Sequence, residues 1–345
     1  MRATATEDRI QCHWSVTMDK IAFFAKNFYV CKMKNFLLLI SILMVSNGYG
    51  QKIYTYYDYL WKPCAPEQAR YFSEIQKTDS GWLRYDYFLG TRTLQMSGLF
   101  EDSATKIANG YFRYFYANGI PETFGQNVHN KKEGLWFRYD YAGHLEDSTV
   151  YMNGKPSGIS LGWHTNGYMA DSISYSPDGS AVEVNWRRDG VPSCAGRLMN
   201  GEPDGPWTFF HANGQLSCRV IYNMGYDQKE EYFDTSGTPE NTSIQDRPPT
   251  FPGGREGWKK FVFKHIYFPS QYKLVNASQV TVVITATIDE DGNVLDPFIE
   301  VPFNKAFDDI ALKIFKKTPK WIPAMRYNRS IVQKIRQPIT FSQSE

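Results

Sequence analysis

The sequence predicts a mainly β protein that ends in a small α+β domain, and three observations support this prediction. Between residues 81 and 237, one short pattern of aromatic residue, turn glycine and alternating strand returns at a nearly constant interval. A polar stretch with prolines follows, and after residue 250 two amphipathic helical segments alternate with strand patterns. We therefore expect an elongated antiparallel sheet of β-hairpin repeats, followed by a domain with two helices and three strands.

The composition bounds the number of domains and argues against one class of partner. A chain of 345 residues is long enough for two or three domains. Its formal net charge is +2, and its lysines and arginines are interspersed with aspartates and glutamates. Nucleic-acid-binding proteins are expected to carry a basic cluster, so we expect no nucleic-acid partner.

The first 50 residues contain a pattern typical of a targeting segment. A basic start at Met33–Asn35 precedes the apolar run Phe36–Val45, and small residues lead up to Gly50. This layout predicts a secretory signal peptide at residues 33–50, with residues 1–32 as an extension upstream of the true start. The apolar run of about ten residues is shorter than the ~20 needed to cross a bilayer, so we expect no membrane span after cleavage.

Residues 51–80 form a lead-in to the repeats. Tyrosines between Tyr54 and Tyr59 are typical of a first strand, which Pro63 and Pro66 would interrupt. The sequence assigns no role to this segment.

Turn glycines mark the repeats at residues 81–237. They are Gly119, Gly143, Gly167, Gly190, Gly214 and Gly237. Subtracting successive positions gives steps of 24, 24, 23, 24 and 23 residues. Several of these turns contain Asn-Gly or Asp-Gly, which predicts two-residue primed turns between antiparallel strands. Because a single hairpin cannot bury its own apolar face, each unit is expected to pack on the next.

An aromatic residue stands four positions before each of these glycines. The constant phase predicts one column of aromatic side chains across the sheet, which we interpret as a structural core rather than a binding site. The column contains Phe115, Tyr139, Trp163, Trp186, Phe210 and Phe233.

The units resemble the MORN-repeat variant family, whose pattern is Gly-x-Trp-x-x-Tyr-x-x-Asn-Gly. Residues 134–143 and 205–214 match this pattern well, and both open with Gly-x-Trp. The unit that ends at Gly190 lacks this opening. The resemblance spans residues 81–237, and it implies units stacked in an extended β-sheet without a catalytic set.

A linker is expected at residues 238–249, which are polar and contain three prolines. The pattern then changes over residues 250–342. Apolar residues between Trp258 and Ile266 follow one face of a helix, and Val280–Ile288 alternates as a strand before a turn at residues 289–293.

A second helix and a last strand complete this part of the chain. Asn304 is the expected N-cap of the helix, and Pro319 is expected to close it. The last strand is expected at residues 330–341. Pro338 has no N–H group to donate, so this strand should lie at the edge of its sheet or end there.

The order of helix, two strands, helix and strand resembles the TonB C-terminal domain over residues 247–341. The motifs that carry the resemblance are Phe251-Pro252-Gly253-Gly254, Phe268-Pro269, Asp291-Gly292 and Pro319-Lys320-Trp321-Ile322-Pro323. The resemblance implies a periplasmic or outer-membrane-associated protein in a TonB-type transmembrane transport context. Its expected partner is an envelope protein, such as an outer-membrane receptor or its peptide, held as an added strand.

Six residues are expected to shape the edge that would take up a partner strand. They are Arg326, Tyr327, Gln333, Lys334, Ile335 and Arg336. Main-chain hydrogen bonds would supply affinity, and these side chains would supply selectivity. The alternative is that they only solvate an edge strand and protect it from aggregation, and the sequence leaves both interpretations open.

Catalytic, cofactor and metal motifs are absent from the sequence, so we expect no enzyme activity. His164 and His211 share one repeat phase, but two repeats separate them by about 20 Å, which is too far for ligands of one metal ion. Cys194 and Cys218 are separated by one strand, and a disulfide between them would need an irregular sheet.

Two functions of different classes stay open. The first is a non-enzymatic periplasmic interaction protein whose C-terminal domain adds a partner strand. In the second, the repeat array is a structural or ligand-binding platform for a glycan, a lipid or a protein, and the C-terminal domain serves only as a docking module. Its platform would be exposed tyrosines such as Tyr151, Tyr175 and Tyr222.

Overall fold

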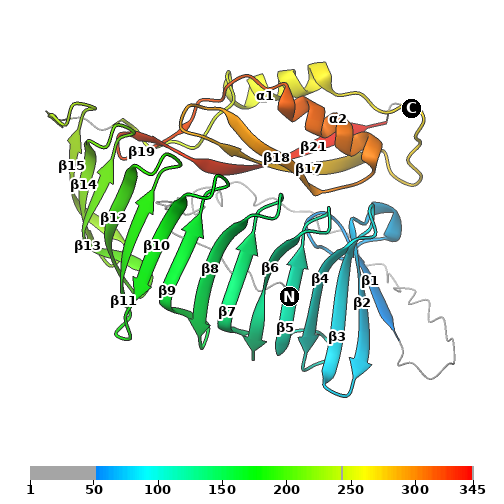
Figure 1. Ribbon diagram of the computed structural model, residues 1–345. Helices are drawn as coiled ribbons and strands as arrows, with labels where there is room; N and C mark the ends of the chain where they lie inside the picture. Colours follow the sequence, from blue (N-terminus) through cyan, green and yellow to red (C-terminus); the bar gives the residue numbers. More distant parts are fainter. Residues whose placement is uncertain (1–51, 242–243, 344–345) are drawn as a thin grey trace, which may run out of the picture.

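The computed structural model describes residues 52–241 and 244–343. The predicted signal peptide and the upstream extension therefore lie outside the described residues. Within them the protein is mainly β, with one sixteen-stranded antiparallel sheet and a smaller part that combines a three-stranded sheet with two helices (Figure 1). The predicted fold class is confirmed at this level.

The large sheet, which we call the repeat sheet, follows the order of the sequence, and each strand pairs antiparallel with the next. Its strands are β1 (Ile53–Tyr57), β2 (Tyr71–Thr78), β3 (Gly81–Phe88), β4 (Leu94–Phe100), β5 (Gly110–Phe115), β6 (Pro121–Val128), β7 (Lys131–Tyr139), β8 (Leu145–Met152), β9 (Lys155–Trp163), β10 (Met169–Tyr175), β11 (Ser180–Trp186), β12 (Pro192–Met199), β13 (Glu202–Phe210), β14 (Leu216–Asn223), β15 (Tyr226–Phe233) and β16 (Pro239–Glu240). The lead-in supplies β1, β2 and a short 3₁₀ helix at Pro66–Gln68. The repeat sheet thus begins at Ile53 rather than at Gly81.

The turns at the six repeat glycines are three-residue loops, so the expected two-residue primed turns are wrong at these positions. At the first of them, the N–H of Tyr116 donates to the carbonyl of Ile120 at 2.9 Å. Gly119 has a φ of 86°, whereas Asn118 keeps a negative φ. A type I turn followed by a left-handed glycine has this geometry. Two-residue turns with positive φ at both positions lie at the other end of the hairpins, as at Asn153-Gly154.

Asparagine recurs in these turns because its side chain joins one repeat to the next. Asn118 Oδ1 accepts the N–H of Ile120 at 3.0 Å, and Asn118 Nδ2 donates to the carbonyl of Tyr141 in the following turn at 2.9 Å. Asn166 and Asn213 make the same bond to the turn that follows them, each at 2.7 Å. The asparagines therefore hold the turns in a row.

The predicted aromatic column is not the core of the repeat sheet. Its six members are all half-buried. The buried aromatic residues, such as Phe112, Trp136 and Trp207, stand seven positions before the turn glycines. Because side chains alternate between the two faces of a strand, an offset of three residues places them on the opposite face from the column.

Glycines on neighbouring strands make room for these buried rings. Gly196 lies opposite Trp207, where a Cβ atom would meet the indole ring at 2.1 Å. Gly125 lies under Trp136 in the same way, at 2.3 Å. The indole N–H of Trp207 donates to the carbonyl of Arg197 at 2.8 Å, so the ring lies flat over the neighbouring strand. This close approach locks one hairpin onto the next.

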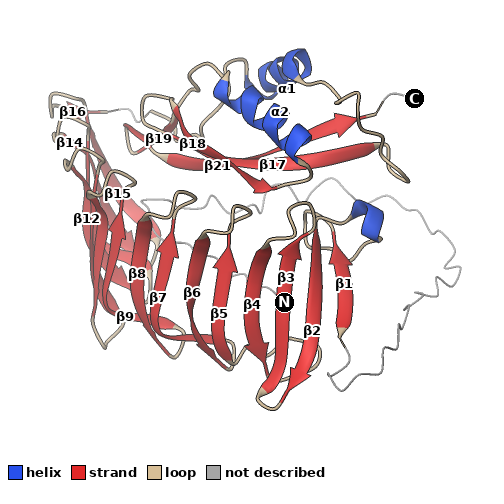
Figure 2. Ribbon diagram, turned by 45° about the vertical axis from the view of Figure 1, so that its right-hand side comes forward, coloured by secondary structure: helices blue, strands red, loops and turns tan. Residues whose placement is uncertain are grey.

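The C-terminal part contains a three-stranded sheet covered on one face by two helices (Figures 1 and 2). Its elements are α1 (Gly254–His265), β17 (Gln279–Ile288), β18 (Val294–Val301), α2 (Lys305–Lys316), β19 (Ala324–Arg326), β20 (Arg329–Ile331) and β21 (Gln333–Ser342). The strand order is β18-β17-β21. Asn304 caps α2 as predicted, because its side chain accepts the N–H of Ala306 at 3.0 Å. Apolar residues of α2, such as Phe307 and Ile314, pack on Val282 of the sheet.

The expected last strand at residues 330–341 is divided in two. Its first residues belong to β20, which pairs with β19 in a separate hairpin. The remainder forms β21, which pairs with β17. The predicted linker is tied down at Arg247, which pairs with Met325, and just after its end Thr250 pairs with Ile322.

The other face of the three-stranded sheet rests on the turn ends of the repeat sheet (Figure 2). Val283 and Val301 are fully buried in a cluster with Tyr71 and Phe88 of the repeat sheet. Phe298, also in β18, stacks on Tyr141 with a ring-centroid distance of 4.5 Å. The two parts therefore share an apolar interface.

We expect Gly196→Ala to lower the free energy of unfolding by about 1–3 kcal/mol, because the Trp207 ring would have to leave its place over the glycine. Chemical denaturation of the whole chain measures this change. Ser174→Ala, at an exposed strand position, is the matched control and should change stability by less than about 0.5 kcal/mol. Equal stability of the two variants would contradict the role assigned to the glycine.

Candidate functional site

The candidate site is the outer edge of β21. This strand pairs with β17 without a break, from Gln333 opposite Ile288 to Ser342 opposite Gln279. In the described part of the chain, no strand pairs with its other side. The expectation that Pro338 marks an edge strand is confirmed.

The register shows which backbone groups of β21 point outward. The N–H of Gln343 donates to the carbonyl of Ser278 at 2.8 Å, so residue 343 faces β17. Hydrogen bonding alternates along an antiparallel strand, and therefore even-numbered residues of β21 direct their N–H and C=O groups outward. Pro338 is one of these outward-facing residues, so its lack of an N–H group does not cost a hydrogen bond to β17. The free donors are the N–H groups of Lys334, Arg336, Thr340 and Ser342.

The side chains of the outward residues lie on the face away from the helices. Lys334 Nζ contacts Glu146 Oε1 of β8 at 2.7 Å. The guanidinium of Arg336 contacts the Glu300 carboxylate at 3.0 Å, and Glu300 also accepts the hydroxyl of Thr285 at 2.6 Å. The side chains of Lys334 and Arg336 are 47% and 44% exposed, so they flank the edge and leave its backbone groups accessible. The edge strand is thus accessible and close to neutral.

Four of the six predicted edge residues lie on β21, and two do not. Gln333 and Ile335 are half-buried, with Ile335 on the helix side, while Lys334 and Arg336 are exposed on the other face. Arg326 and Tyr327 lie instead in the β19–β20 hairpin. The sequence analysis grouped Arg326 and Tyr327 with this edge because they stand only a few residues before the expected strand at residues 330–341.

The β19–β20 hairpin fastens the C-terminal part to the repeat sheet. Tyr327 is only 6% exposed, its ring lies 4.2 Å from that of Phe209, and its hydroxyl group is hydrogen-bonded to that of Tyr222. Arg326 Nη2 donates to the Tyr327 hydroxyl at 3.3 Å. Tyr222 is buried, so its predicted exposure is wrong. This burial raises the pKa of its hydroxyl group.

Arg329 extends the same contact. Its Nη1 donates to the Ser193 hydroxyl at 2.7 Å, and its guanidinium lies 5.5 Å from the centre of the Phe209 ring. Burial, reinforced by the neighbouring Arg187 cation, lowers the pKa of Arg329 to about 10. Arg187 itself contacts Glu290 of the β17–β18 turn at 3.0 Å. The hairpin and this turn therefore hold the three-stranded sheet in one orientation on the repeats.

A second polar contact lies at the other end of the interface. Arg70 lies over the Phe303 ring at 4.6 Å and donates to the carbonyl of Thr281 at 3.4 Å. Asp308, in the first turn of α2, accepts the N–H of Phe303 at 3.0 Å. Burial raises the pKa of Asp308 to about 6, although Arg70 and this hydrogen bond act in the opposite direction.

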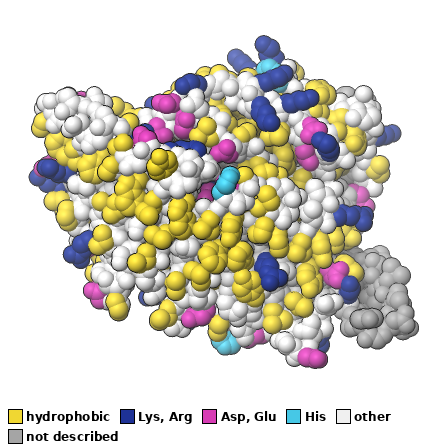
Figure 3. Space-filling view, in the orientation of Figure 1, with side chains coloured by type: hydrophobic (Ala, Val, Ile, Leu, Met, Phe, Trp, Pro, Cys, Tyr) yellow, Lys and Arg dark blue, Asp and Glu magenta, His cyan; other side chains and the backbone are white. Residues whose placement is uncertain are grey.

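A belt of exposed apolar side chains crosses the repeat sheet, and sequence analysis missed it. Tyr111, Leu135, Ile159 and Val182 stand eight positions before the turn glycines and are 45%, 48%, 59% and 53% exposed. We call these four residues the exposed belt. Figure 3 shows hydrophobic side chains gathered over the strands of the repeat sheet on the face in view. The constant position of these apolar residues relative to the turn glycines is a sequence signal from which the belt could have been predicted.

Two histidines and two cysteines of the repeats occupy structural positions. His164 and His211 each bond through Nε2 to a backbone carbonyl of the next repeat, at 3.0 Å. Cys194, Phe209 and Cys218 lie in one row across three strands, as the spacing predicted. Cys218 is a free thiol, so no disulfide joins it to Cys194, and burial raises its pKa to about 12.

Within residues 52–241 and 244–343, no three His, Cys, Asp or Glu residues come together as a metal site. No helix in the same ranges is both long and apolar enough to cross a bilayer. Compared with models of known protein families and with curated protein sequences, the chain has no match.

Asp308 makes stability depend on pH in a specific direction. Its folded pKa of about 6 lies above the ~3.9 of an unfolded aspartate, so the folded state holds a proton that the unfolded state has released between pH 4 and 6. The free energy of unfolding should therefore fall by about 2 kcal/mol across this window through Asp308 alone.

Asp308→Asn removes this titration and retains an acceptor for the N–H of Phe303. Chemical denaturation of both proteins at pH 4, 5, 6 and 7 gives the difference in stability, which should shift in favour of the variant as the pH rises. A difference that stays constant with pH would contradict the assignment.

Proposed function

We propose that this is a non-enzymatic interaction protein of the cell envelope, which binds an extended segment of a partner protein by adding it as a strand beside β21. The open edge of β21 is the observation that carries the proposal. Unpaired N–H and C=O groups on an accessible edge are a template for strand addition.

Two features of the sequence support the envelope setting. Residues 247–341 resemble the TonB C-terminal domain, a family that takes up a partner peptide in this way. The signal-like pattern at residues 33–50 favours export of the chain. On this basis the partner is an envelope protein, such as an outer-membrane receptor or its peptide, in a TonB-type transport context.

The repeat sheet contributes a rigid base to this function. Contacts at Tyr327, Arg187 and Arg70 hold the three-stranded sheet at three places along the repeats. A strand that adds to β21 would therefore meet an edge of fixed orientation, which lowers the cost of ordering the site on binding.

Proline substitution tests strand addition directly, because it removes an outward N–H without touching the bonds to β17. Thr340→Pro is the test variant, and Thr340→Ala is its matched control, since both lose the hydroxyl contact with Thr281. Capture of partners from cell-envelope extract by the mature chain should fall about tenfold with proline and stay near the parental level with alanine.

Hydrogen exchange supplies the second readout. Amides of residues 333–342 should gain protection when the partner is bound. Equal capture by Thr340→Pro and Thr340→Ala would contradict strand addition at this edge.

A second candidate function is that of a binding platform on the repeats, and the exposed belt favours it. Exposed apolar side chains gathered on one face are a mark of interaction sites. Leu135→Glu with Ile159→Glu should abolish capture by this platform while leaving the fold intact, because both side chains are exposed. Thr235→Glu, at an exposed turn, is the control. Retention of every captured partner by the double variant would contradict the platform.

A further inference from the structure

The repeat sheet has an open edge of its own at β15. The next strand, β16, contains only two residues and pairs with Tyr232 and Phe233. The rest of β15, from Tyr226 to Glu231, pairs with β14 on one side and with no strand on the other in the described part of the chain. Most of β15 is therefore an edge strand, paired on one side only.

The free backbone groups at this edge include those of Glu230. Asp234 directly follows β15. Its N–H donates to the carbonyl of Thr238, which directly precedes β16, at 2.9 Å, so the backbone of Asp234 faces β16. The alternation of an antiparallel strand then directs Tyr232 and Glu230 to the same side. β16 takes up Tyr232, and Glu230 is left facing outward.

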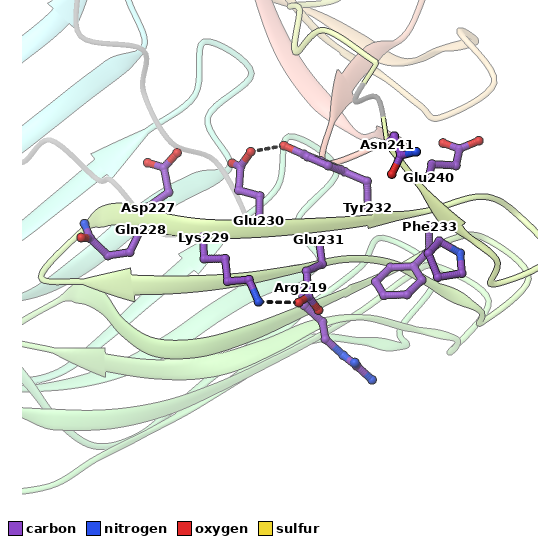
Figure 4. Close-up of a pocket in the computed structure, with 11 residues that line it drawn as sticks. Arg219, Asp227, Gln228, Lys229, Glu230, Glu231, Tyr232, Phe233, Glu240 and Asn241 are labelled. Carbon is purple, nitrogen blue, oxygen red and sulfur yellow. Dashed lines mark hydrogen bonds and ion pairs between the residues drawn. The ribbon is translucent and has the colours of Figure 1, made fainter.

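A hollow of about 900 Å³ lies along this edge, lined by β15, β16 and Arg219 (Figure 4). On one side of β15, Asp227 and Glu230 point the same way as Tyr232, whose hydroxyl donates to Glu230. Glu240 of β16 lies opposite Tyr232 in the sheet. This side of the strand thus carries three carboxylates.

The cations of the hollow lie on the other side of the strand. Lys229 contacts Glu231 at 2.8 Å, and the Arg219 guanidinium lies 5.6 Å from the centre of the Phe233 ring (Figure 4). Arg326, from the β19–β20 hairpin, is not among the residues that line the hollow, and its Nε lies 3.8 Å from Asp246 Oδ2. The side of β15 that carries Asp227 and Glu230 is therefore negatively charged. No lysine or arginine among the residues that line the hollow lies on that side.

We propose that the β15 edge takes up an extended, basic segment of a partner protein as a further strand of the repeat sheet. Main-chain bonds to Glu230 and its neighbours would hold the segment. Side chains of a strand alternate between faces, so lysine or arginine at every second position would face Asp227 and Glu230. The carboxylates would select basic segments and reject acidic ones.

This site is separate from the one proposed on β21, because the two edges belong to different sheets. The acidic side chains alone would also protect an unused edge against aggregation. Binding of a basic strand distinguishes the two roles.

The test uses the mature chain and two nine-residue peptides, one alternating lysine with threonine and the other alternating glutamate with threonine. Fluorescence anisotropy should show the lysine peptide binding at least about tenfold more tightly than the glutamate peptide, and more weakly as salt is raised. Hydrogen exchange should show protection of residues 226–231 by the lysine peptide.

Asp227→Lys with Glu230→Lys should reverse this preference. Glu202→Lys with Glu256→Lys changes the charge equally at exposed sites elsewhere and should leave the preference as it was. Thr340→Pro, which blocks the β21 edge, should also leave it unchanged.

Three results would overturn the proposal. The first is that the lysine peptide does not bind at millimolar concentration. The carboxylates would then serve only to protect the edge against aggregation. Another is protection of residues 333–342 in place of residues 226–231. The third is a dimer in sedimentation that the Asp227→Lys, Glu230→Lys variant loses, which would assign the edge to a second copy of the chain.

Discussion

Side-chain bonds from the repeat turns at Gly119, Gly167 and Gly214 to the backbone of the next repeat are the interactions on which the rest of the structure depends. Asn118, Asn166 and Asn213 reach the following turn, and His164 and His211 reach the end of the following strand pair. These bonds satisfy carbonyl groups that would otherwise point to solvent at the turn ends. They hold the turns in a row, and this row is the surface on which the three-stranded sheet rests (Figure 1).

The interface treats the two outer strands of the three-stranded sheet, β18 and β21, differently. Its helices cover one face of the small sheet, and the turn row covers the other at β17 and β18. Glu290 and Phe298 fix the β18 side to the repeats. β21 lies furthest from this contact and shows exposed side chains on its uncovered face. An edge held in this way needs little rearrangement to accept a strand.

Local signals in the sequence predicted much of the fold, and non-local packing decided the rest. The glycine period gave the hairpin order, Asn304 gave the helix start, and Pro338 gave the edge, because each acts within a few residues. Which face of the sheet is buried depends on the glycines opposite Trp136 and Trp207, which belong to other strands. The burial of Tyr327 against Phe209 joins segments more than a hundred residues apart, and no local pattern announces it.

The two open edges differ in charge, and this difference bears on what each can accept. At β21, Lys334 and Arg336 are each paired with a glutamate, so under the proposed strand addition the edge would select through backbone bonds and shape. At β15, Asp227 and Glu230 lie on a side without a lysine or arginine among the residues lining the hollow, so the proposed strand addition there would discriminate by charge. Because the cations of β21 are already paired, they offer little attraction to the β15 edge of another copy. On these proposals the two edges would therefore suit different segments.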